Sequence, residues 1–328
     1  MNTRETVKKA AYFGAILVLM IVVIYSGLQI LEATVFSKEQ VEETLPVSKT
    51  IVRDGVEYFP KQDMMVLMVL GIDQTGPVQA SDSYNNHGAS DMVALLIFDE
   101  ASQTCRVLTL NRDTMLEMPV LGIGGKQAGT YYGQLALSHT YGSGLEDSCE
   151  NTRQAVSDLL YGLYIDYYVA MNMDAIAIAN DAVGGVTVQV EEDFSAVDPT
   201  IPMGTVTLQG EQALRYVRTR KDLGDQLNLS RMDRHEKYMK SFLKSLGRCL
   251  EESDTFALEL FDAVDEYIVT DCSANTLSTI MSRYSEYEIV EIVSPAGDNV
   301  LGEQYYEFYV DEEALDQLIL RLLYAPKR

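Results

Sequence analysis

An uncharged segment near the N-terminus constrains this chain more than any other feature. Between Lys9 and Glu32 there are 22 consecutive residues without a charge. At a rise of about 1.5 Å per residue, a helix of that length crosses a hydrocarbon core of about 30 Å. The alternative is a cleaved signal peptide, whose apolar core is usually about 7–15 residues long and is followed by small residues at the cleavage site. We therefore expect an uncleaved transmembrane helix at residues 10–31.

The charges that flank this segment give its expected orientation. Basic residues precede the segment and acidic residues follow it: Arg4, Lys8 and Lys9 before it, and Glu32, Glu39, Glu42 and Glu43 after it. Because basic flanks stay on the cytoplasmic side, residues 1–9 are expected to form a cytoplasmic tail. Residues 32–62 are polar and mixed, which is typical of a stalk. Residues 63–328 are then expected to form one extracellular domain.

The net charge narrows the choice of partners. The chain has a formal net charge of −24 and a pI near 4.4. Nucleic acid duplexes are bound mainly through broad basic surfaces. We therefore expect no nucleic acid partner.

The four cysteines leave two possibilities open. Cys105, Cys149, Cys249 and Cys272 could form disulfides in an exported domain, or they could remain separate buried thiols. Their spacing matches no zinc-binding pattern.

Three short apolar runs predict strands at residues 64–71, 92–98 and 106–110. The last two are joined by a short turn at residues 99–102 and should form a hairpin. The hairpin brings Asp91 and Arg112 to the same edge of the sheet. If the first strand pairs antiparallel to the second, Asp73 joins them there.

The rest of the chain alternates between helical and strand patterns. Helices are predicted at residues 151–161, with Thr152 as a possible N-cap, and at 174–183, ended by two glycines. Strands at 167–171 and 186–190 bracket the second helix. A long amphipathic helix follows from Arg231, with Ser230 as its candidate N-cap. This alternation predicts an α/β fold with layered helices and sheet.

Basic residues are concentrated in one part of this acidic chain. Residues 211–248 contain ten of the 25 Lys and Arg residues and only five acidic residues. Guanidinium groups bind phosphate oxygens in a bidentate manner. Arg218 and Arg220 would point to the same side of an extended chain, and Arg231 lies in the first turn of the long helix, where anions are favoured. Arg234, one turn later, could equally belong to a solvated helix face. The cluster predicts a phosphate-binding site.

Asp73 and Asp91 are candidate metal ligands beside this site. Carboxylates that face a phosphate commonly hold Mg²⁺ through one or two protein oxygens. Each residue alone could instead cap a turn, and Arg112 could simply pair with the adjacent Asp113. The chain contains no Gly-x-Ser-x-Gly, Ser-x-x-Lys, His-Glu-x-x-His or Walker-type motif. A metal ion and arginines together are typical of enzymes that transfer phosphoryl groups. Such enzymes position the substrate and neutralise its charge.

The order of the motifs resembles the LytR-CpsA-Psr family over residues 64–250. The matching segments are Val-Leu-Gly-Ile-Asp73, Ser-Asp91, Asn-Arg112-Asp-Thr, Gln134-Leu-Ala-Leu-Ser-His-Thr-Tyr-Gly142, Asp166-Tyr-Tyr-Val, Asp181-Ala-Val-Gly-Gly-Val186, Leu208-Gln-Gly-Glu-Gln-Ala-Leu-Arg-Tyr-Val-Arg-Thr-Arg220 and Asn228-Leu-Ser-Arg-Met-Asp-Arg-His235. An N-terminal anchor with an external domain also suits that family.

The resemblance implies a function and roles for several residues. Members of the family are cell-wall glycopolymer ligases that move a phosphoglycan from a polyprenyl-pyrophosphate lipid onto peptidoglycan. The implied fold is an α/β sheet flanked by helices, with an apolar pocket for the prenyl chain. Asp73 and Asp91 match the Mg²⁺-associated carboxylates of the family. Its pyrophosphate-binding, catalytic arginines correspond to Arg112, Arg218, Arg220 and Arg231.

Three positions depart from the family pattern. Asn228 replaces the usual Asp of the Asp-x-x-Arg segment, and His235 replaces a Gln; we expect both to contact substrate. Gly88 and Ala89 occupy the stretch where the family has an Arg before the second metal-associated Asp. Asn228 cannot act as a general base, and this departure together with Gly88 and Ala89 leaves room for a function without catalysis. The sequence therefore leaves two other functions open. One is a non-catalytic, membrane-anchored binder or sensor of lipid-linked glycans, and the other is a polyprenyl-pyrophosphate pyrophosphatase.

Overall fold

The structure is a computed structural model that describes residues 50–327 except 54, 62, 84, 123–124, 220–227, 254, 273–279, 281–282, 285–286 and 304. The predicted cytoplasmic tail, the transmembrane helix at residues 10–31 and the first part of the stalk lie outside the described residues. Within the described part, no helix is both long enough and apolar enough to cross a membrane.

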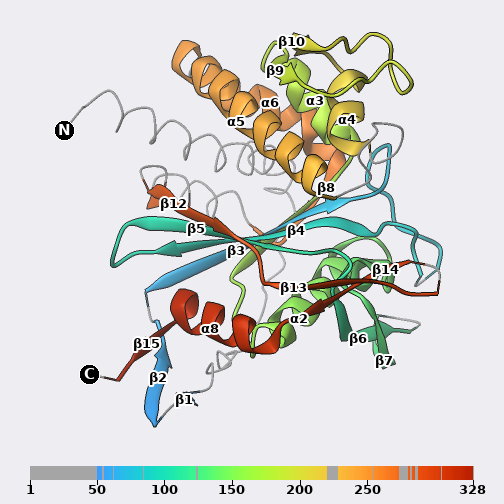
Figure 1. Ribbon diagram of the computed structural model, residues 1–328. Helices are drawn as coiled ribbons and strands as arrows, with labels where there is room; N and C mark the ends of the chain where they lie inside the picture. The colour runs from blue at the N-terminus through green and yellow to red at the C-terminus, as the bar shows by residue number, and fades with distance from the viewer. Residues whose placement is uncertain are drawn as a thin grey trace, which may run out of the picture.

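A six-stranded mixed sheet forms the centre of the described chain (Figure 1). Its strands are β3 (Met64–Ile72), β4 (Ser90–Asp99), β5 (Thr104–Leu110), β8 (Tyr167–Asn172), β11 (Ile268–Thr270) and β12 (Glu288–Val293), in the order β11-β8-β3-β4-β5-β12. β3 runs parallel to β8 and antiparallel to β4, and β4 runs antiparallel to β5. β3 is apolar along its whole length because both faces of the sheet are covered.

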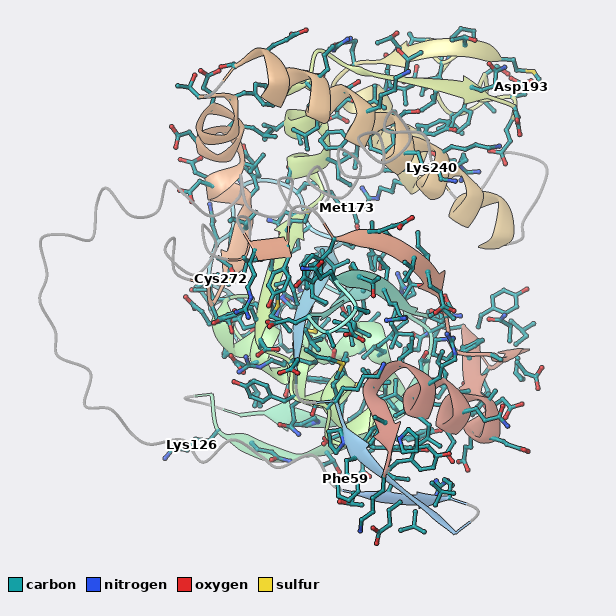
Figure 2. The ribbon with its side chains drawn as sticks, turned by 90° about the vertical axis from the view of Figure 1, so that its left-hand side faces the viewer. Phe59, Lys126, Met173, Asp193, Lys240 and Cys272 are labelled. Atoms are coloured by element: carbon teal, nitrogen blue, oxygen red, sulfur yellow. The ribbon has the colours of Figure 1, made fainter. Side chains whose placement is uncertain are left out.

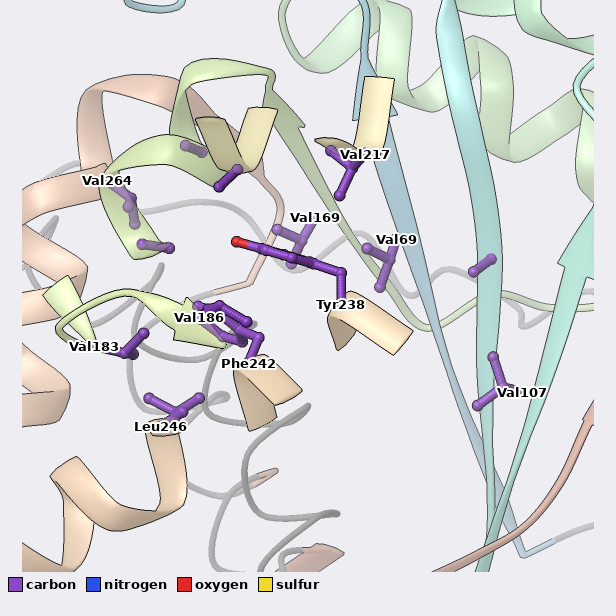
Figure 3. Close-up of a cluster of buried hydrophobic side chains, with 14 of the residues drawn as sticks. Val69, Val107, Val169, Val183, Val186, Val217, Tyr238, Phe242, Leu246 and Val264 are labelled. Carbon is purple, nitrogen blue, oxygen red and sulfur yellow. The ribbon is translucent and has the colours of Figure 1, made fainter. Parts of the chain in front are cut away.

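The first face of the sheet is covered by helices and a two-stranded ribbon. These elements are α3 (Asp174–Ala182), α4 (Glu211–Arg218), α5 (Asn228–Glu252), α6 (Phe256–Val264), the short η4 (Asp265–Tyr267), β9 (Val186–Val190) and β10 (Gly204–Leu208). Figure 3 shows part of the core between them, where Tyr238 and Phe242 of α5 pack beside Val186 of β9 and Val169 of β8. The amphipathic face of α5 therefore packs toward the sheet, as its periodicity predicts.

The second face of the sheet is covered by η3 (Leu135–Thr140), α2 (Glu146–Leu159) and α8 (Glu312–Leu323). Alternate residues of β3 divide between the two faces, so that Leu67 joins the first core and Met68 the second. Asp311 caps α8 by accepting a hydrogen bond from the N–H of Ala314. The result is the three-layered α/β/α arrangement that the sequence predicts.

Three small strand groups surround the second face. They are the hairpin of β6 (Met115–Leu121) and β7 (Gln127–Gln134), the hairpin of β13 (Gly297–Leu301) and β14 (Tyr306–Val310), and the group of β1 (Ile51–Arg53), β2 (Val56–Pro60) and β15 (Tyr324–Pro326). β2 pairs with β15 near the C-terminus. β1 and β2, which lie in the stretch that the sequence assigns to the stalk, therefore belong to the folded domain.

The strand predictions agree well with the structure. All three predicted strands of the first 110 residues are present, and β4 and β5 form the expected hairpin. The strand at 186–190 is present as β9, but it pairs with β10 outside the main sheet. The two glycines after α3, Gly184 and Gly185, have positive φ angles of 80° and 90°, as expected for a helix end.

Two helix starts were predicted too late. α2 begins at Glu146 instead of residue 151, with Glu146 and Asp147 in its first turn, where the helix dipole favours acidic residues. Thr152 is a buried interior residue whose hydroxyl donates to the carbonyl of Ser148, so it is not the cap. α5 begins at Asn228, which places Ser230 inside the helix and not at its N-cap.

All four cysteines are free thiols in this structure. Burial raises the pKa of Cys105 and Cys149 far above the ordinary value of a thiol. Of the two possibilities that the sequence left open, this fold has the separate thiols.

Candidate functional site

Strand register brings the candidate site residues to one edge of the sheet. Ile72 of β3 pairs with Ser90 of β4, and the N–H of Asp73 donates to the carbonyl of Ala89 at 2.9 Å. Asp91 then follows Ser90 at the start of β4. This is the arrangement that the predicted hairpin and the antiparallel first strand require.

Asp91 and Arg112 form a half-buried ion pair at this edge. A terminal guanidinium nitrogen of Arg112 donates to Oδ1 of Asp91, and its Nε donates to Oδ1 of Asp113 at 3.3 Å. The side chain of Arg112 is 19% exposed and that of Asp91 is 17% exposed. The contact with Asp113, which the sequence offers as an alternative, is thus present in addition to the contact with Asp91.

Asp73 and Arg218 form a second, more exposed ion pair. Nη2 of Arg218 donates to Oδ1 of Asp73 at 2.6 Å. The Arg218 side chain is 50% exposed. Arg218 is the last residue of α4 and lies on the first face of the sheet, 145 residues along the chain from Asp73. The site is therefore assembled from a sheet edge and a helix C-terminus.

The loop after Asp73 is held by the junction of β8 and α3. The carboxylate of Asp174 accepts a hydrogen bond from the N–H of Gly76, and the side chain of Asn172 donates to the carbonyl of Gly76 at 2.9 Å. The N–H of Met173 donates to the carbonyl of Gln74 at 2.9 Å. Figure 2 places Met173 between the sheet and the helices of the first face. These contacts fix the direction in which the chain leaves Asp73.

The loop before Asp91 is held by a buried polar network. The amide nitrogen of Asn86 donates to the carbonyls of His139, Thr140 and Gly142, and its oxygen accepts from the N–H of Gly88. Nδ1 of His139 donates to the carbonyl of Gly88 at 2.7 Å. Burial lowers the pKa of His139 to about 4, so this ring is neutral at physiological pH. His139 therefore holds the loop before Asp91 as a neutral, buried side chain.

Gly88 occupies a position with no room for a side chain. A Cβ atom there would lie 2.9 Å from the side chains of Gln74 and Ile72. At Gly88 itself, an arginine would therefore require Gln74 and Ile72 to shift.

Arg234 is buried and supports the backbone around Arg218. Its side chain is only 5% exposed, and its guanidinium donates to the carbonyls of Tyr216 and Thr219 and to the carboxylate of Glu192. It also lies 5.8 Å from the centre of the Phe194 ring. The sequence-based alternative of a solvated helix face is wrong for Arg234. Periodicity could not reveal this burial, because the segment that covers the residue comes from a distant part of the chain.

The structure describes only part of the helical half of the site, which we define as the candidate residues from Arg218 to His235. Arg220 lies outside the described residues, and of Arg231, Asn228 and His235 only the backbone is described, all three in α5. The expectation that Arg218 and Arg220 share one side of an extended segment is wrong for Arg218, because this residue ends a helix. The structure brings Asp73, Asp91, Arg112 and Arg218 to one edge, and the roles of all the candidate residues stay predictions.

The carboxylates at this edge would suit a magnesium ion that takes its remaining ligands from a phosphate. Asp73, directly after β3, and Asp91 of β4 have carboxylate oxygens that could serve as ligands, and each carboxylate is paired with an arginine. Among the described residues no cluster of three acidic, His or Cys side chains could hold a metal alone. Mg²⁺ commonly takes one or two carboxylates and completes its shell with substrate phosphates and water. The two carboxylates thus suit an ion that arrives with a phosphorylated substrate.

Sequence reasoning missed one polar residue beside the site. Nε2 of Gln134, at the end of β7, donates to Oδ1 of Asp113 at 2.9 Å and to the carbonyl of Tyr306 at 2.8 Å. Gln134 thereby connects the residue next to Arg112 with the β13–β14 hairpin. The only sequence signal was its place at the start of a family-like motif.

Comparison with known proteins supports a family assignment. The model of the LytR_cpsA_psr family matches residues 24–322. The chain is 26% identical over 263 residues to a protein of Oceanobacillus iheyensis named polyisoprenyl-teichoic acid–peptidoglycan teichoic acid transferase TagU, covering 78% of this chain and 75% of that protein. It is 28% identical to the Enterococcus faecalis protein of the same name, covering 84% and 82%.

Solved structures show the same fold. Protein gbs0355 from Streptococcus agalactiae has a TM-score of 0.63 at 22% identity, covering 79% of this chain and 86% of that one. A structure described as TagT bound to LI-WTA has a TM-score of 0.56 at 23% identity, covering 84% and 95%. With a family model that spans most of its length, this chain belongs to the LytR-CpsA-Psr family.

Proposed function

We propose that this protein transfers a phosphoglycan from a polyprenyl-pyrophosphate carrier onto peptidoglycan. Two arginine–carboxylate pairs that meet at one sheet edge carry the proposal. Arg112 and Arg218 come from different layers of the fold, and such a meeting of guanidiniums suits a diphosphate. The curated relatives named as teichoic acid transferases support the same reaction class.

In the proposed reaction, a sugar hydroxyl of peptidoglycan attacks the phosphorus nearest the transferred glycan. A new P–O bond forms to the acceptor, and the bond from the same phosphorus to the bridging oxygen of the pyrophosphate breaks. Polyprenyl phosphate leaves, and the proton of the attacking hydroxyl passes to this departing phosphate. Arg112 and Arg218, with Arg220 and Arg231, neutralise the charge that develops on the phosphoryl oxygens. Before substrate binds, Asp91 keeps Arg112 and Asp73 keeps Arg218 at this edge of the sheet.

Asp73 and Asp91 are the residues that would hold Mg²⁺ in this proposal. When bound, the ion would screen the negative charge of the pyrophosphate and polarise its oxygens. The two carboxylates would orient the phosphates through the ion, while the arginines they release would contact phosphate oxygens directly. Because the protein supplies so few ligands, we expect the ion to bind weakly without a diphosphate.

Metal binding can be measured without any transfer reaction. The test ligand is geranyl pyrophosphate, a short soluble prenyl diphosphate. We expect Mg²⁺ to raise the Tm of the wild-type protein by more in the presence of this ligand than in its absence. The Asp73→Asn/Asp91→Asn variant should lose this additional shift. A shift from Mg²⁺ with the diphosphate that is the same in wild type and variant would place the ion elsewhere.

The lipid donor agrees with the predicted N-terminal anchor. A polyprenyl carrier stays in the membrane, and the transmembrane helix expected at residues 10–31 would keep the domain beside it. The orientation expected from the flanking charges would put the domain on the outer side, where peptidoglycan lies.

The test compares two arginines on the same helix. Arg215 and Arg218 both lie on α4, are 49% and 50% exposed, and each pairs with one aspartate, Asp198 for Arg215 and Asp73 for Arg218. In a reconstituted assay with lipid-linked glycan, peptidoglycan and Mg²⁺, Arg218→Ala and Asp91→Ala should lose most of their transfer activity. Arg215→Ala should keep it.

The same assay distinguishes the remaining possibilities. Near-wild-type transfer by both Arg218→Ala and Asp91→Ala would contradict the assigned site. Donor binding by the wild-type protein without any product would favour a non-catalytic binder. Release of lipid phosphate without modification of peptidoglycan would favour a pyrophosphatase.

A further inference from the structure

Gln134 lies where three segments that are far apart in the sequence meet. It is the last residue of β7, and its side-chain nitrogen donates to Oδ1 of Asp113 at 2.9 Å and to the carbonyl of Tyr306 in β14 at 2.8 Å. The β6–β7 and β13–β14 hairpins lie next to each other in Figure 1, and Thr114, just before β6, pairs with Phe308 of β14. Gln134 therefore links Asp113 to both hairpins.

Both partners of the Gln134 amide are acceptors. Because a carboxylate and a backbone carbonyl accept hydrogen bonds, the NH₂ group of the amide has to face them. Glutamate has the same shape but would bring acceptor oxygens against both partners, and leucine would bring no donor. The contacts at this position therefore require a side chain of this length that carries two N–H groups.

Asp113 in turn contacts the guanidinium of Arg112. The same oxygen that accepts from Gln134, Oδ1 of Asp113, also accepts from Nε of Arg112 at 3.3 Å. The side chains of Arg112 and Asp113 are 19% and 23% exposed, so solvent and salt screen this pair less than a fully exposed one. Because one oxygen serves both donors, the place of the Gln134 amide also sets the place at which Nε of Arg112 finds its partner.

The main chain beside Gln134 has hydrogen bonds of its own. The N–H of Ala136, in η3, donates to the carbonyl of Arg112 at 2.9 Å, and the N–H of Phe308 donates to the carbonyl of Asp113 at 2.8 Å. Neither bond involves the side chain of Gln134. Removal of this side chain should therefore leave the local backbone in place and change mainly the side chains of Asp113 and Arg112.

A contact at Nε suits an arginine that has to exchange partners. In the proposed reaction, Asp91 releases a terminal nitrogen of Arg112 to phosphate. Asp113 contacts Nε, at the base of the guanidinium, and this contact does not use the terminal nitrogens that can bind phosphate in a bidentate manner. Asp113 can therefore keep the guanidinium oriented while substrate replaces Asp91.

We propose that Gln134 is a positioning residue, which acts through Asp113 to orient the guanidinium of Arg112 toward the pyrophosphate. This inference rests on the proposed function and adds to it a residue that needs no contact with substrate. The competing explanation is that Gln134 only holds the two hairpins together. In that case its removal would have the same effect with any residue at position 112, whereas a positioning role requires the planar fork of arginine.

A double-mutant cycle in the full-length protein separates these two roles. The variants are Gln134→Leu, Arg112→Lys and the combination of both, since lysine keeps the charge and lacks the fork. Two quantities are measured with Mg²⁺ present: the affinity for geranyl pyrophosphate, by calorimetry, and kcat for transfer from the lipid-linked donor to peptidoglycan. The matched control is Gln127→Leu, because Gln127 begins the same strand and its amide donates to the carbonyl of Gly129 at 3.4 Å. Urea unfolding gives the stability of every variant.

Gln134→Leu should lower kcat about tenfold or more, because a small misplacement of a group that acts on the substrate can cost up to about a hundredfold. Its affinity for geranyl pyrophosphate should fall about threefold or more, as expected for side chains in one hydrogen-bonded network. In the Arg112→Lys protein, the same change should alter either quantity by less than about twofold. Gln127→Leu should match wild type.

Two results would overturn the inference. One is an equal loss from Gln134→Leu in the wild-type and Arg112→Lys proteins, and the other is wild-type affinity and kcat in Gln134→Leu. If Gln134→Leu does not fold, Gln134→Glu takes its place in the cycle, because it keeps the shape and removes both donors, and the same criteria apply. Coupling of Gln134 and Arg112 in geranyl pyrophosphate affinity, without any transfer by the wild-type protein, would refute the proposed function and leave the positioning of Arg112 standing.

Discussion

The two halves of the candidate site are built in different ways. The sheet-edge half contains Asp73, Asp91 and Arg112, which strand register and a short hairpin bring together. The helical half contains Arg218 at the end of α4, held by the buried Arg234 of α5. Backbone pairing fixes the first half, whereas side-chain packing between helices fixes the second.

This difference affects exposure and expected function. Arg112 is 19% exposed and contacts two carboxylates, whereas Arg218 is 50% exposed and contacts Asp73. Ion pairs away from water are stronger and less adaptable than exposed ones. We infer that the sheet edge is a fixed platform and that Arg218 adjusts to the substrate.

The largest expected effect is that of Arg112→Ala. Loss of an arginine that neutralises phosphoryl charge can reduce turnover on the order of 10³-fold. The variant also leaves the half-buried carboxylate of Asp91 without this partner. Initial transfer rates should therefore fall further in Arg112→Ala than in Arg218→Ala, with circular dichroism confirming that both variants fold. A larger loss in Arg218→Ala would reverse the proposed order of the two halves.

The helical half can be disturbed alone through Arg234. Removing one partner of a buried ion pair costs roughly 3 kcal/mol, so Arg234→Met should lower the free energy of unfolding by about that much. Amide exchange should increase in α4 and not in β4 and β5. Lys237→Met is the matched control, because Lys237 pairs with Glu191 beside Glu192 but is more exposed, and it should cost less than about 1 kcal/mol. Equal costs for the two variants would show that burial of Arg234 is unimportant.

The sheet-edge half should be the one that responds to acid. The pKa of His139 is lowered from 6.5 to about 4, chiefly by burial, while the Gly88 carbonyl and the charge of Asp147 oppose this shift. The unfolded chain therefore binds a proton near pH 6.5 that the folded chain does not bind until about pH 4. The stability from His139 is fully present above pH 6.5, falls as the pH drops to 4, and changes no further below that.

The total loss over this range should be roughly 3 kcal/mol. Urea unfolding of wild type and His139→Asn between pH 7 and pH 4 would measure it, since other carboxylates contribute equally to both proteins. The free energy of unfolding should fall more steeply with decreasing pH in wild type than in His139→Asn. The thiol of Cys149, whose Sγ lies 3.8 Å from Nε2 of His139, should stay neutral in this range because burial raises its pKa. Parallel curves would show that His139 is not the responsible group.

The contrast between backbone pairing and helix packing also explains which parts of the site the sequence predicts. The sheet-edge half was predictable because short apolar runs and one tight turn define the register, and register alone brings Asp91 beside Arg112. The layered α/β fold followed from the alternation of helix and strand patterns. The late start predicted for α2 arose because its first turn is polar and does not show the apolar period.

The helical half was less predictable. Whether Arg234 faces solvent depends on residues 192–194, which lie about forty positions earlier and pack over it only in the folded chain. Helical period alone cannot distinguish such a residue from a solvated one.

The most direct test of the central claim is a double-mutant cycle with Arg112→Lys and Arg218→Lys on kcat/KM for the lipid-linked donor. Both changes keep the charge and remove the planar fork. If both halves hold one diphosphate, the two losses should be coupled by at least about 0.5 kcal/mol. Losses that add within about 0.3 kcal/mol, or near-wild-type rates in both single variants, would contradict a shared substrate at this site.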